Sequence, residues 1–234
     1  NTILKQSFIL LIIYKKKLDM SIKKKYLPSK RSFIDNFLVM DVLSDSNKLE
    51  KSGKEVFHLE LGEPLPKTPK KVLKEAENLL NKKVPGYTPS NGIIELRQAI
   101  SKYYHKKGIL IDKDQIFITV GSSGAFLLTF LASFDPGDSV AIFSPSYPAY
   151  RNILKSLGIR VVEIFDFEEF IKFNKKKKIN GLIVSNPTNP TGKVFSYEEL
   201  KTIYDFCEIS EITLISDEIY HGIEFDKKSY SLSI

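Results

Sequence analysis

Short apolar runs alternate with amphipathic stretches from residue 57 onward, and this alternation restricts the chain to few folds. The strand candidates are rich in valine and isoleucine: residues 115–120 (QIFITV), 138–143 (DSVAIF), 159–164 (IRVVEI), 180–185 (NGLIVS) and 212–216 (ITLIS). Helix-like segments lie among them, at residues 93–107, 122–134, 149–157 and 196–210. Strands alternating with helices of this length predict βαβ units. We therefore expect an α/β fold, a three-layer α-β-α arrangement with a mostly parallel sheet.

The last of these helices carries its own start signal. Ser196 precedes Glu199 by three residues, the spacing of a capping box, in which each side chain binds the other residue's backbone N–H. The helix is expected to begin there.

The composition is typical of a globular chain, and the distribution of its lysines argues against a nucleic-acid or membrane partner. Of 234 residues, 42% are hydrophobic and 27% charged, enough for one large domain or part of a two-domain protein. The net charge of +7 would suit an anionic partner. The lysines, however, are scattered or in short runs such as residues 175–178, and no nucleic-acid-binding motif accompanies them. A solvated, lysine-rich surface is the expected outcome.

The cysteine and histidine content argues against a metal site. Cys207 is the single cysteine, which excludes an internal disulfide, and its helical surroundings favour a core thiol over a nucleophile. His58, His105 and His221 lie far apart and show no ligand spacing. We expect no bound metal.

The N-terminal region reads differently from the rest. The apolar run at residues 8–14 (FILLIIY) is too short to span a bilayer, and no signal-peptide cleavage site follows it. We expect residues 1–19 to be a non-native or fragment-edge extension. Residues 20–60 are expected to form an N-terminal arm or part of a smaller domain, and residues 61–234 an incomplete large domain. The expected location is the cytoplasm.

Polar turns follow the ends of several strand candidates. In open α/β sheets, ligands bind beyond the carboxyl ends of the strands. The turns rich in glycine, proline and polar residues are TVGSSGAF (residues 119–126), SPSYPAY (144–150), SNPTNPTG (185–192) and DEIYHG (217–222). All of them are expected to project to one edge of the sheet.

Two of these turns suggest an anion-binding site and an aromatic ring that could stack on a ligand. Residues 121–124 (GSSG) lead into a helix, whose first N–H groups are free to bind an anion such as phosphate. The run matches neither a Walker loop nor GxGxxG, and a serine acting as a plain helix cap is the alternative. Tyr147 could stack on a planar ligand, or it could be a core aromatic.

The other two turns offer polar groups for a heterocycle. Asp217 could face a cationic ring nitrogen, or it could cap the turn. Tyr220 could bind a ring oxygen through its hydroxyl. Asn189 lies between two prolines, which restrict the backbone and would hold its amide in place.

The motifs together resemble those of the class I/II aminotransferases, the fold type I, aspartate-aminotransferase-like enzymes that use pyridoxal 5′-phosphate. The resemblance runs from about residue 59 to the last residue, with the motifs in family order. They are LGEP (61–64), GYTPSNGIIELRQAI (86–100), TVGSSGAFLL (119–128), PGDSVAIFSPSYPAY (136–150), NPTNPTG (186–192) and ISDEIYHG (215–222).

The resemblance implies roles for individual residues and a reaction. It implies that the N–H groups of Ser122 and Ser123 hold the cofactor phosphate, that Tyr147 stacks on the pyridine ring and that Asp217 pairs with the ring nitrogen. It also implies that Asn189 and Tyr220 bind the phenolic oxygen. The family reaction moves an amino group from an amino acid to a 2-oxo acid.

Further implied contacts concern the substrate and a second subunit. By the resemblance, Gly62 lies near the substrate carboxylate and Asn189 also faces the substrate. Tyr87 would reach the phosphate of a neighbouring subunit, which implies a homodimer.

The resemblance places the family's Schiff-base lysine in an SxSK-like motif beyond Ile234. Lys227 and Lys228 lie too close to Asp217 and lack that motif, so no residue of the chain is assigned as catalytic. We expect a C-terminally truncated chain, inactive alone, with a shortened segment at residues 165–178. A different reaction on the same scaffold (that of a C–S lyase or of a cyclopropane-forming synthase) and a non-catalytic remnant stay open as alternatives.

Overall fold

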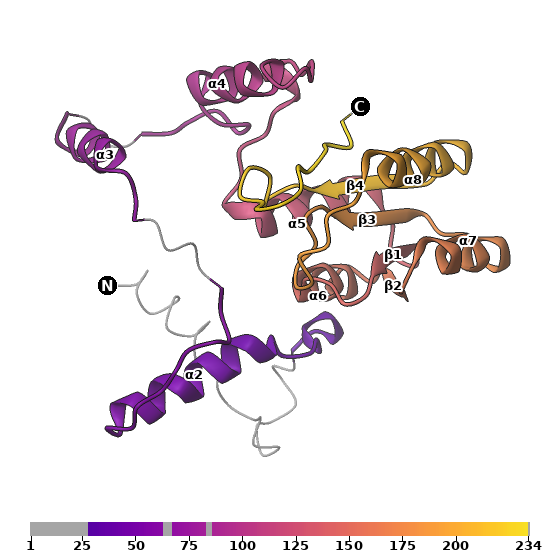
Figure 1. Ribbon diagram of the computed structural model, residues 1–234, viewed down its shortest axis with the longest axis horizontal. Coiled ribbons are helices and arrows are strands. Elements are labelled where there is room, and N and C mark those ends of the chain that lie inside the picture. The colour runs from indigo at the N-terminus through magenta and orange to yellow at the C-terminus, as the bar shows by residue number, and fades with distance from the viewer. Residues whose placement is uncertain (1–27, 63–66, 83–85, 234) are drawn as a thin grey trace. The chain divides into compact units, whose positions relative to one another are not determined.

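The computed structural model describes residues 28–62, 67–82 and 86–233 (Figure 1). The chain divides into two units, residues 1–33 and residues 34–234. Within the first unit the described residues contain one turn of 3-10 helix, η1 (Lys30–Ser32). The expected extension at residues 1–19 lies outside the described residues. The elements that follow all belong to the second unit.

The first part of the second unit is helical. It contains α2 (Leu38–Lys51), α3 (Lys70–Lys82), α4 (Ile94–His105) and the 3-10 turn η2 (Lys113–Gln115). Only α4 is among the helices expected from the sequence. Arg97 of α4 donates to the carbonyl of Lys113 and to the Asp114 carboxylate, both at 2.9 Å, which ties α4 to η2.

A four-stranded parallel sheet forms the centre of the second unit (Figure 1). The strands are β1 (Ser139–Phe143), β2 (Arg160–Ile164), β3 (Gly181–Ser185) and β4 (Thr213–Asp217), in the order β2-β1-β3-β4. Helices α5 (Gly121–Ser133), α6 (Pro148–Ser156), α7 (Phe167–Lys176) and α8 (Tyr197–Ile209) connect to them. The expected α/β fold with a parallel sheet is confirmed.

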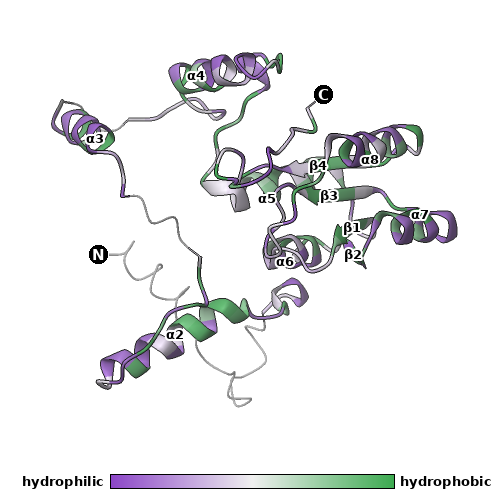
Figure 2. Ribbon diagram, in the orientation of Figure 1, coloured by the Kyte–Doolittle hydropathy of each residue, from purple (hydrophilic) through white to green (hydrophobic). Residues whose placement is uncertain are grey.

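Alternate strand residues enter two separate cores, which gives the three layers. In β1, Val140 and Ile142 pack with Phe126 and Phe130 of α5 and with Leu154 of α6. Neighbouring strand residues point to the opposite face, where α7 and α8 cover them: Ala141, Leu182 and Val184 pack with Phe170, Leu200 and Ile203. The two central strands, β1 and β3, are buried on both faces and are therefore largely hydrophobic, as the green ribbon of β3 in Figure 2 shows.

The expected strand at residues 115–120 is wrong. Beyond η2 this segment is irregular, and its Ile118 N–H donates to the Asn91 carbonyl at 3.1 Å instead of joining the sheet. A strand exists only as part of a ladder, and neither edge strand, β2 nor β4, pairs with this segment. Phe117 and Val120 are consequently exposed.

Helix α7 was not among the expected helices, since residues 165–178 were expected only as a shortened segment. The structure shows the reason for the helix. The Asp166 side chain accepts from the Glu169 N–H at 2.8 Å, and acidic residues in the first turn and lysines in the last complement the helix dipole. The capping box of Ser196 and Glu199, in contrast, was expected and is confirmed at the start of α8.

Cys207 is buried in the core under α8, where it was expected. Burial raises the pKa of the Cys207 thiol to about 12, so it is neutral at physiological pH. In the described ranges, no cluster of three or more His, Cys, Asp or Glu side chains is placed to hold a metal ion. Among the same residues, no helix has the length and apolar character needed to cross a membrane.

Gly181 provides a test of the packing between β3 and α5. A Cβ atom at this position would lie 2.3 Å from Cζ of Phe134, a buried ring at the end of α5. Because the ring is enclosed, we expect Gly181→Ala to destabilise the 234-residue chain by about 1–3 kcal/mol. Urea denaturation measures the effect.

Gly86→Ala is the matched control, because a Cβ there meets nothing within 4 Å. Equal stability of the two variants would contradict the packing described for Phe134.

Candidate functional site

The register of β3 and β4 brings two of the polar turns together. Ser185 pairs with Asp217 at the carboxyl ends of these strands. One residue further, the Asn186 N–H donates to the Asp217 carbonyl at 3.0 Å. The turns SNPTNPTG and DEIYHG therefore start at the same level of the sheet edge.

Asn186 holds the SNPTNPTG turn in place. Its side chain is almost fully buried, donates to the Tyr230 carbonyl at 3.0 Å and accepts from the Phe195 N–H at 3.0 Å. Thr188 closes the turn, accepting from the Gly192 N–H at 2.7 Å through its carbonyl. The peptide bonds before both prolines of the turn are cis. The sequence interpretation gave Asn186 no role.

Asn189 and Tyr220 lie together, as expected for two groups that would bind one oxygen. The Asn189 amide donates to the Tyr220 hydroxyl at 3.1 Å. Both side chains line a cavity of about 730 Å³ between the SNPTNPTG turn and residues 223–227. The paired prolines thus present the Asn189 amide to the neighbouring turn.

Asp217 is a buried carboxylate with two donors. It accepts from the Tyr150 hydroxyl, which reaches it from α6, and from the Ile219 N–H at 3.2 Å. Tyr150 is itself 2% exposed, and burial together with this hydrogen bond raises its pKa well above the usual range. The nearby Tyr220 raises that pKa further. Tyr150 therefore stays a neutral donor to Asp217.

Tyr147 stands one helical turn before Tyr150 and packs against it. The two rings meet edge to face with centroids 5.6 Å apart, and the Phe37 ring also meets Tyr147 edge to face, at 5.9 Å. Tyr147 is half-buried. The structure thus places the expected stacking ring beside the residue that holds Asp217.

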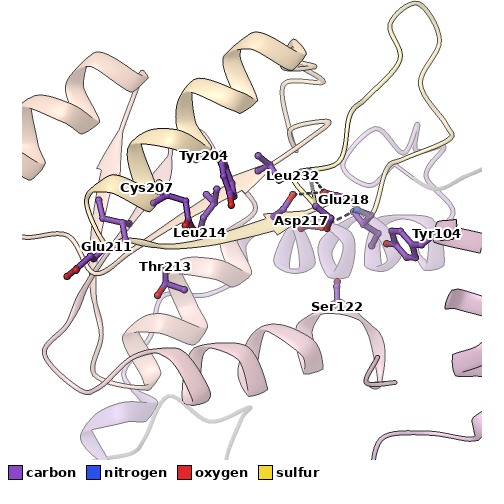
Figure 3. A pocket seen from close by; sticks show the side chains of 15 residues that line it. Tyr104, Ser122, Tyr204, Cys207, Glu211, Thr213, Leu214, Asp217, Glu218 and Leu232 are labelled. Carbon is purple, nitrogen blue, oxygen red and sulfur yellow. Dashed lines mark hydrogen bonds between the residues drawn. The ribbon is translucent and has the colours of Figure 1, made fainter. Parts of the chain in front are cut away.

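The GSSG turn forms the N-terminus of α5. Gly121 has φ of 70°, in the left-handed region that favours glycine, and Val120 provides no side-chain cap. Within the described residues the N–H groups of Ser122 and Ser123 have no hydrogen-bond partner, as the first turn of a helix allows. Ser122 and Asp217 line one cleft of about 1030 Å³, and Figure 3 shows the Ser122 side chain pointing toward Asp217.

Four of the expected residues line two cavities, whereas Ser123, Tyr147, Tyr87 and Gly62 line neither of them. Asp217 and Ser122 share one cleft, whereas Asn189 and Tyr220 line the other cavity. Tyr87 is fully exposed, and Gly62 is exposed with open space around it. Neither lines these two cavities, and the rest of the LGEP motif, residues 63–64, lies outside the described residues.

The arrangement suits a planar, phosphorylated heterocycle. The free N–H groups at the start of α5 can bind an anion, and the buried Asp217 carboxylate can bind a cationic nitrogen. Tyr150 is the contributor that sequence reasoning missed. Its spacing of three residues from Tyr147, one turn of a helix, was the available signal.

A family model described as "Aminotransferase class I and II" matches residues 54–233. Among curated relatives, valine–pyruvate aminotransferase of Mycobacterium tuberculosis is 40% identical over 203 residues, which cover 83% of this chain and 52% of the relative. The (5-formylfuran-3-yl)methyl phosphate transaminase of Methanocaldococcus jannaschii is 39% identical over 198 residues, covering 84% and 52%. The chain spans about half the length of the curated relatives it matches.

Solved structures resemble the chain over a similar extent. An aminotransferase from Mycobacterium tuberculosis superposes with a TM-score of 0.82 at 38% identity, covering 88% of this chain and 55% of that one. Aspartate aminotransferase from Thermus thermophilus with maleate gives a TM-score of 0.83 at 28% identity, covering 88% and 57%.

Tyr150→Phe tests the support of Asp217. The variant leaves a buried carboxylate without one of its donors, so we expect it to unfold about 1–3 kcal/mol more easily at pH 7. The pKa of Tyr150 is higher in the folded chain than in the unfolded chain, where it is near 10. Tyr150 therefore stabilises the fold fully below about pH 10, and this stabilisation is lost as the pH rises further. The variant should therefore lose stability less steeply than the parent chain between pH 10 and 11.

Urea denaturation across this pH range measures both effects. Tyr204→Phe is the control, since no hydrogen bond of the Tyr204 hydroxyl is present within the described residues and its ring packs on the core. If both variants behave alike, the Tyr150–Asp217 contact does not stabilise the fold.

Proposed function

The chain belongs to the class I and II aminotransferase family, and from this we propose that its protein transfers an amino group from an amino acid to a 2-oxo acid with pyridoxal 5′-phosphate. The observation that carries the proposal is the buried Asp217 carboxylate, held by Tyr150 in one cleft with Ser122. Relatives named as aminotransferases support this reaction over a lyase on the same scaffold.

The residues present fit the cofactor. A pyridinium nitrogen needs a carboxylate partner, and Asp217 is a buried carboxylate held in place by two hydrogen bonds. A phosphate group needs several donors, and the N–H groups of Ser122 and Ser123 are free within the described residues. A phenolic oxygen needs a donor, which the Asn189–Tyr220 pair supplies.

Each of these residues has a task in the proposed reaction. Pyridoxal phosphate, when bound, supplies a ring that withdraws electrons from the substrate's α-carbon. Asp217 keeps the ring nitrogen protonated, and Tyr150 holds Asp217 in its orientation. Asn189 and Tyr220 would hold the phenolic oxygen of the ring. Tyr147, which packs against Tyr150, would stack on the ring.

The substrates and the assembly are part of the same proposal. Relatives are named for valine, pyruvate and aspartate, which supports amino acids and 2-oxo acids as the substrate class. We assign Gly62 to the side of the substrate carboxylate. The full exposure of Tyr87 leaves its hydroxyl available to a second copy of the chain, which supports a homodimer.

Binding of pyridoxamine 5′-phosphate to the 234-residue chain tests this assignment without requiring a covalent bond. We expect Asp217→Asn to weaken binding at least about tenfold, because a hydrogen bond between two charged groups becomes a neutral one. Pyridoxamine without its phosphate should bind more weakly than the phosphorylated compound. Equilibrium dialysis measures both.

Asp205→Asn is the control, because this aspartate is paired with Lys201 on the exposed face of α8. Binding that is unaffected by Asp217→Asn, or equally reduced by Asp205→Asn, would contradict the proposed cofactor site.

A further inference from the structure

A third cavity, of about 570 Å³, lies between the C-terminal end of α4 and residues 218–231. We call it the basic cavity. Its walls carry lysine and tyrosine side chains together with one histidine: Lys106, Lys107, Lys228, Tyr103, Tyr230 and His221. Its volume falls within the range of small-molecule sites. None of Ser122, Asn189, Asp217 or Tyr220 lines it, although Tyr104 and Glu218 line both this cavity and the cleft of about 1030 Å³.

The lysines of the basic cavity lack acidic partners. Within the described residues, Lys106, Lys107 and Lys228 form no salt bridge, although many other lysines of the chain do. Lys107 lies over the Tyr103 ring at 4.5 Å, and its contact with Tyr103 raises its pKa, so it is cationic. Positive charges that are not engaged in salt bridges favour an anion, although Glu218 also lines the cavity.

The nearest acidic groups are already occupied. One oxygen of Glu218 accepts from Ser216, Ser231 and the Leu232 N–H, each at 2.9 Å, and the other faces Nδ1 of His221 at 3.4 Å. Glu224 accepts from two backbone N–H groups. Hydrogen bonds thus hold both carboxylates to their own loop.

The carbonyl groups of Tyr104 and His105, at the C-terminal end of α4, are hydrogen-bonded and so are not free to repel an anion. The Tyr104 carbonyl accepts from Lys107 and Ile109, and the His105 carbonyl accepts from Gly108. Gly108 has φ of 84°, the left-handed conformation that closes a helix C-terminus. The lysine side chains of the basic cavity therefore lie beside a helix end whose Tyr104 and His105 carbonyl groups already accept hydrogen bonds.

His221 is the unsatisfied group of this cavity. Its Nε2 atom is buried and has no hydrogen-bond partner within the described residues, while Nδ1 faces Glu218. Buried polar atoms without partners are rare and often mark a missing ligand or water. The imidazole is therefore a sensitive reporter of what occupies the cavity.

We propose that the basic cavity binds a small multivalent oxyanion, of the diphosphate class, independently of the cofactor cleft. Three ammonium groups match the charge of a diphosphate, because each lysine binds a phosphate oxygen as a point charge. Hydroxyl groups of Tyr103 and Tyr230 supply further donors. The site requires neither the bound cofactor nor the transfer of an amino group.

Titration of the 234-residue chain with pyrophosphate tests the proposal. We expect the double variant Lys106→Ala/Lys228→Ala to weaken pyrophosphate binding at least about tenfold, measured by calorimetry at fixed salt. The binding of pyridoxamine 5′-phosphate should be unchanged in this variant. The control is Lys175→Ala/Lys176→Ala, which removes the same charge from the exposed end of α7.

The histidine NMR signals add a local readout, because the chain has three histidines. Pyrophosphate should shift the ring signals of His221 and leave those of His58 unchanged. The proposal is wrong if the two double variants bind pyrophosphate equally, or if the shifts exclude His221. Loss of pyridoxamine phosphate binding with intact pyrophosphate binding would instead overturn the proposed function alone.

Discussion

The parallel pairing of β3 with β4 is the interaction on which the candidate site depends. Their residues pair in sequence from Gly181 with Thr213 to Ser185 with Asp217, and Asn186 adds one more hydrogen bond past the strand end. A slip of one residue would turn Asp217 to the other face of the sheet, away from Tyr150. Because β3 is buried on both faces, its hydrophobic pattern alone does not fix this register. The hydrogen bond from the Asn186 N–H to the Asp217 carbonyl holds the register at the strand ends, where the carboxylate lies.

The central sheet could be predicted from the sequence because its strands are short, apolar and bounded by turn residues. The same reasoning failed at residues 115–120, where valine and isoleucine are present but no neighbouring strand pairs with them. Local composition does not say whether a partner exists. Helix α7 was missed although Phe167, Phe170 and Ile171 have helical spacing, because its lysine run resembles a solvated surface.

The site could be predicted in part. The Pro-flanked Asn189 and the Tyr220 that follows β4 meet as expected, because parallel strands bring their carboxyl ends to one edge. The partnership of Tyr150 with Asp217 spans 67 residues and has no local signature, so only the folded chain shows it. Gly62 and Tyr87 were assigned from family resemblance alone. The structure leaves both exposed.

The protonation state of a bound cofactor ring tests the central claim most directly. Pyridoxamine 5′-phosphate labelled with ¹⁵N in its ring reports by NMR whether that nitrogen carries a proton. If the nitrogen faces the Asp217 carboxylate, the signal of the bound ligand should stay that of a pyridinium to a higher pH than in free solution. A bound signal that titrates like the free ligand, and that Asp217→Asn does not change, would contradict the assignment of Asp217 and with it the whole site.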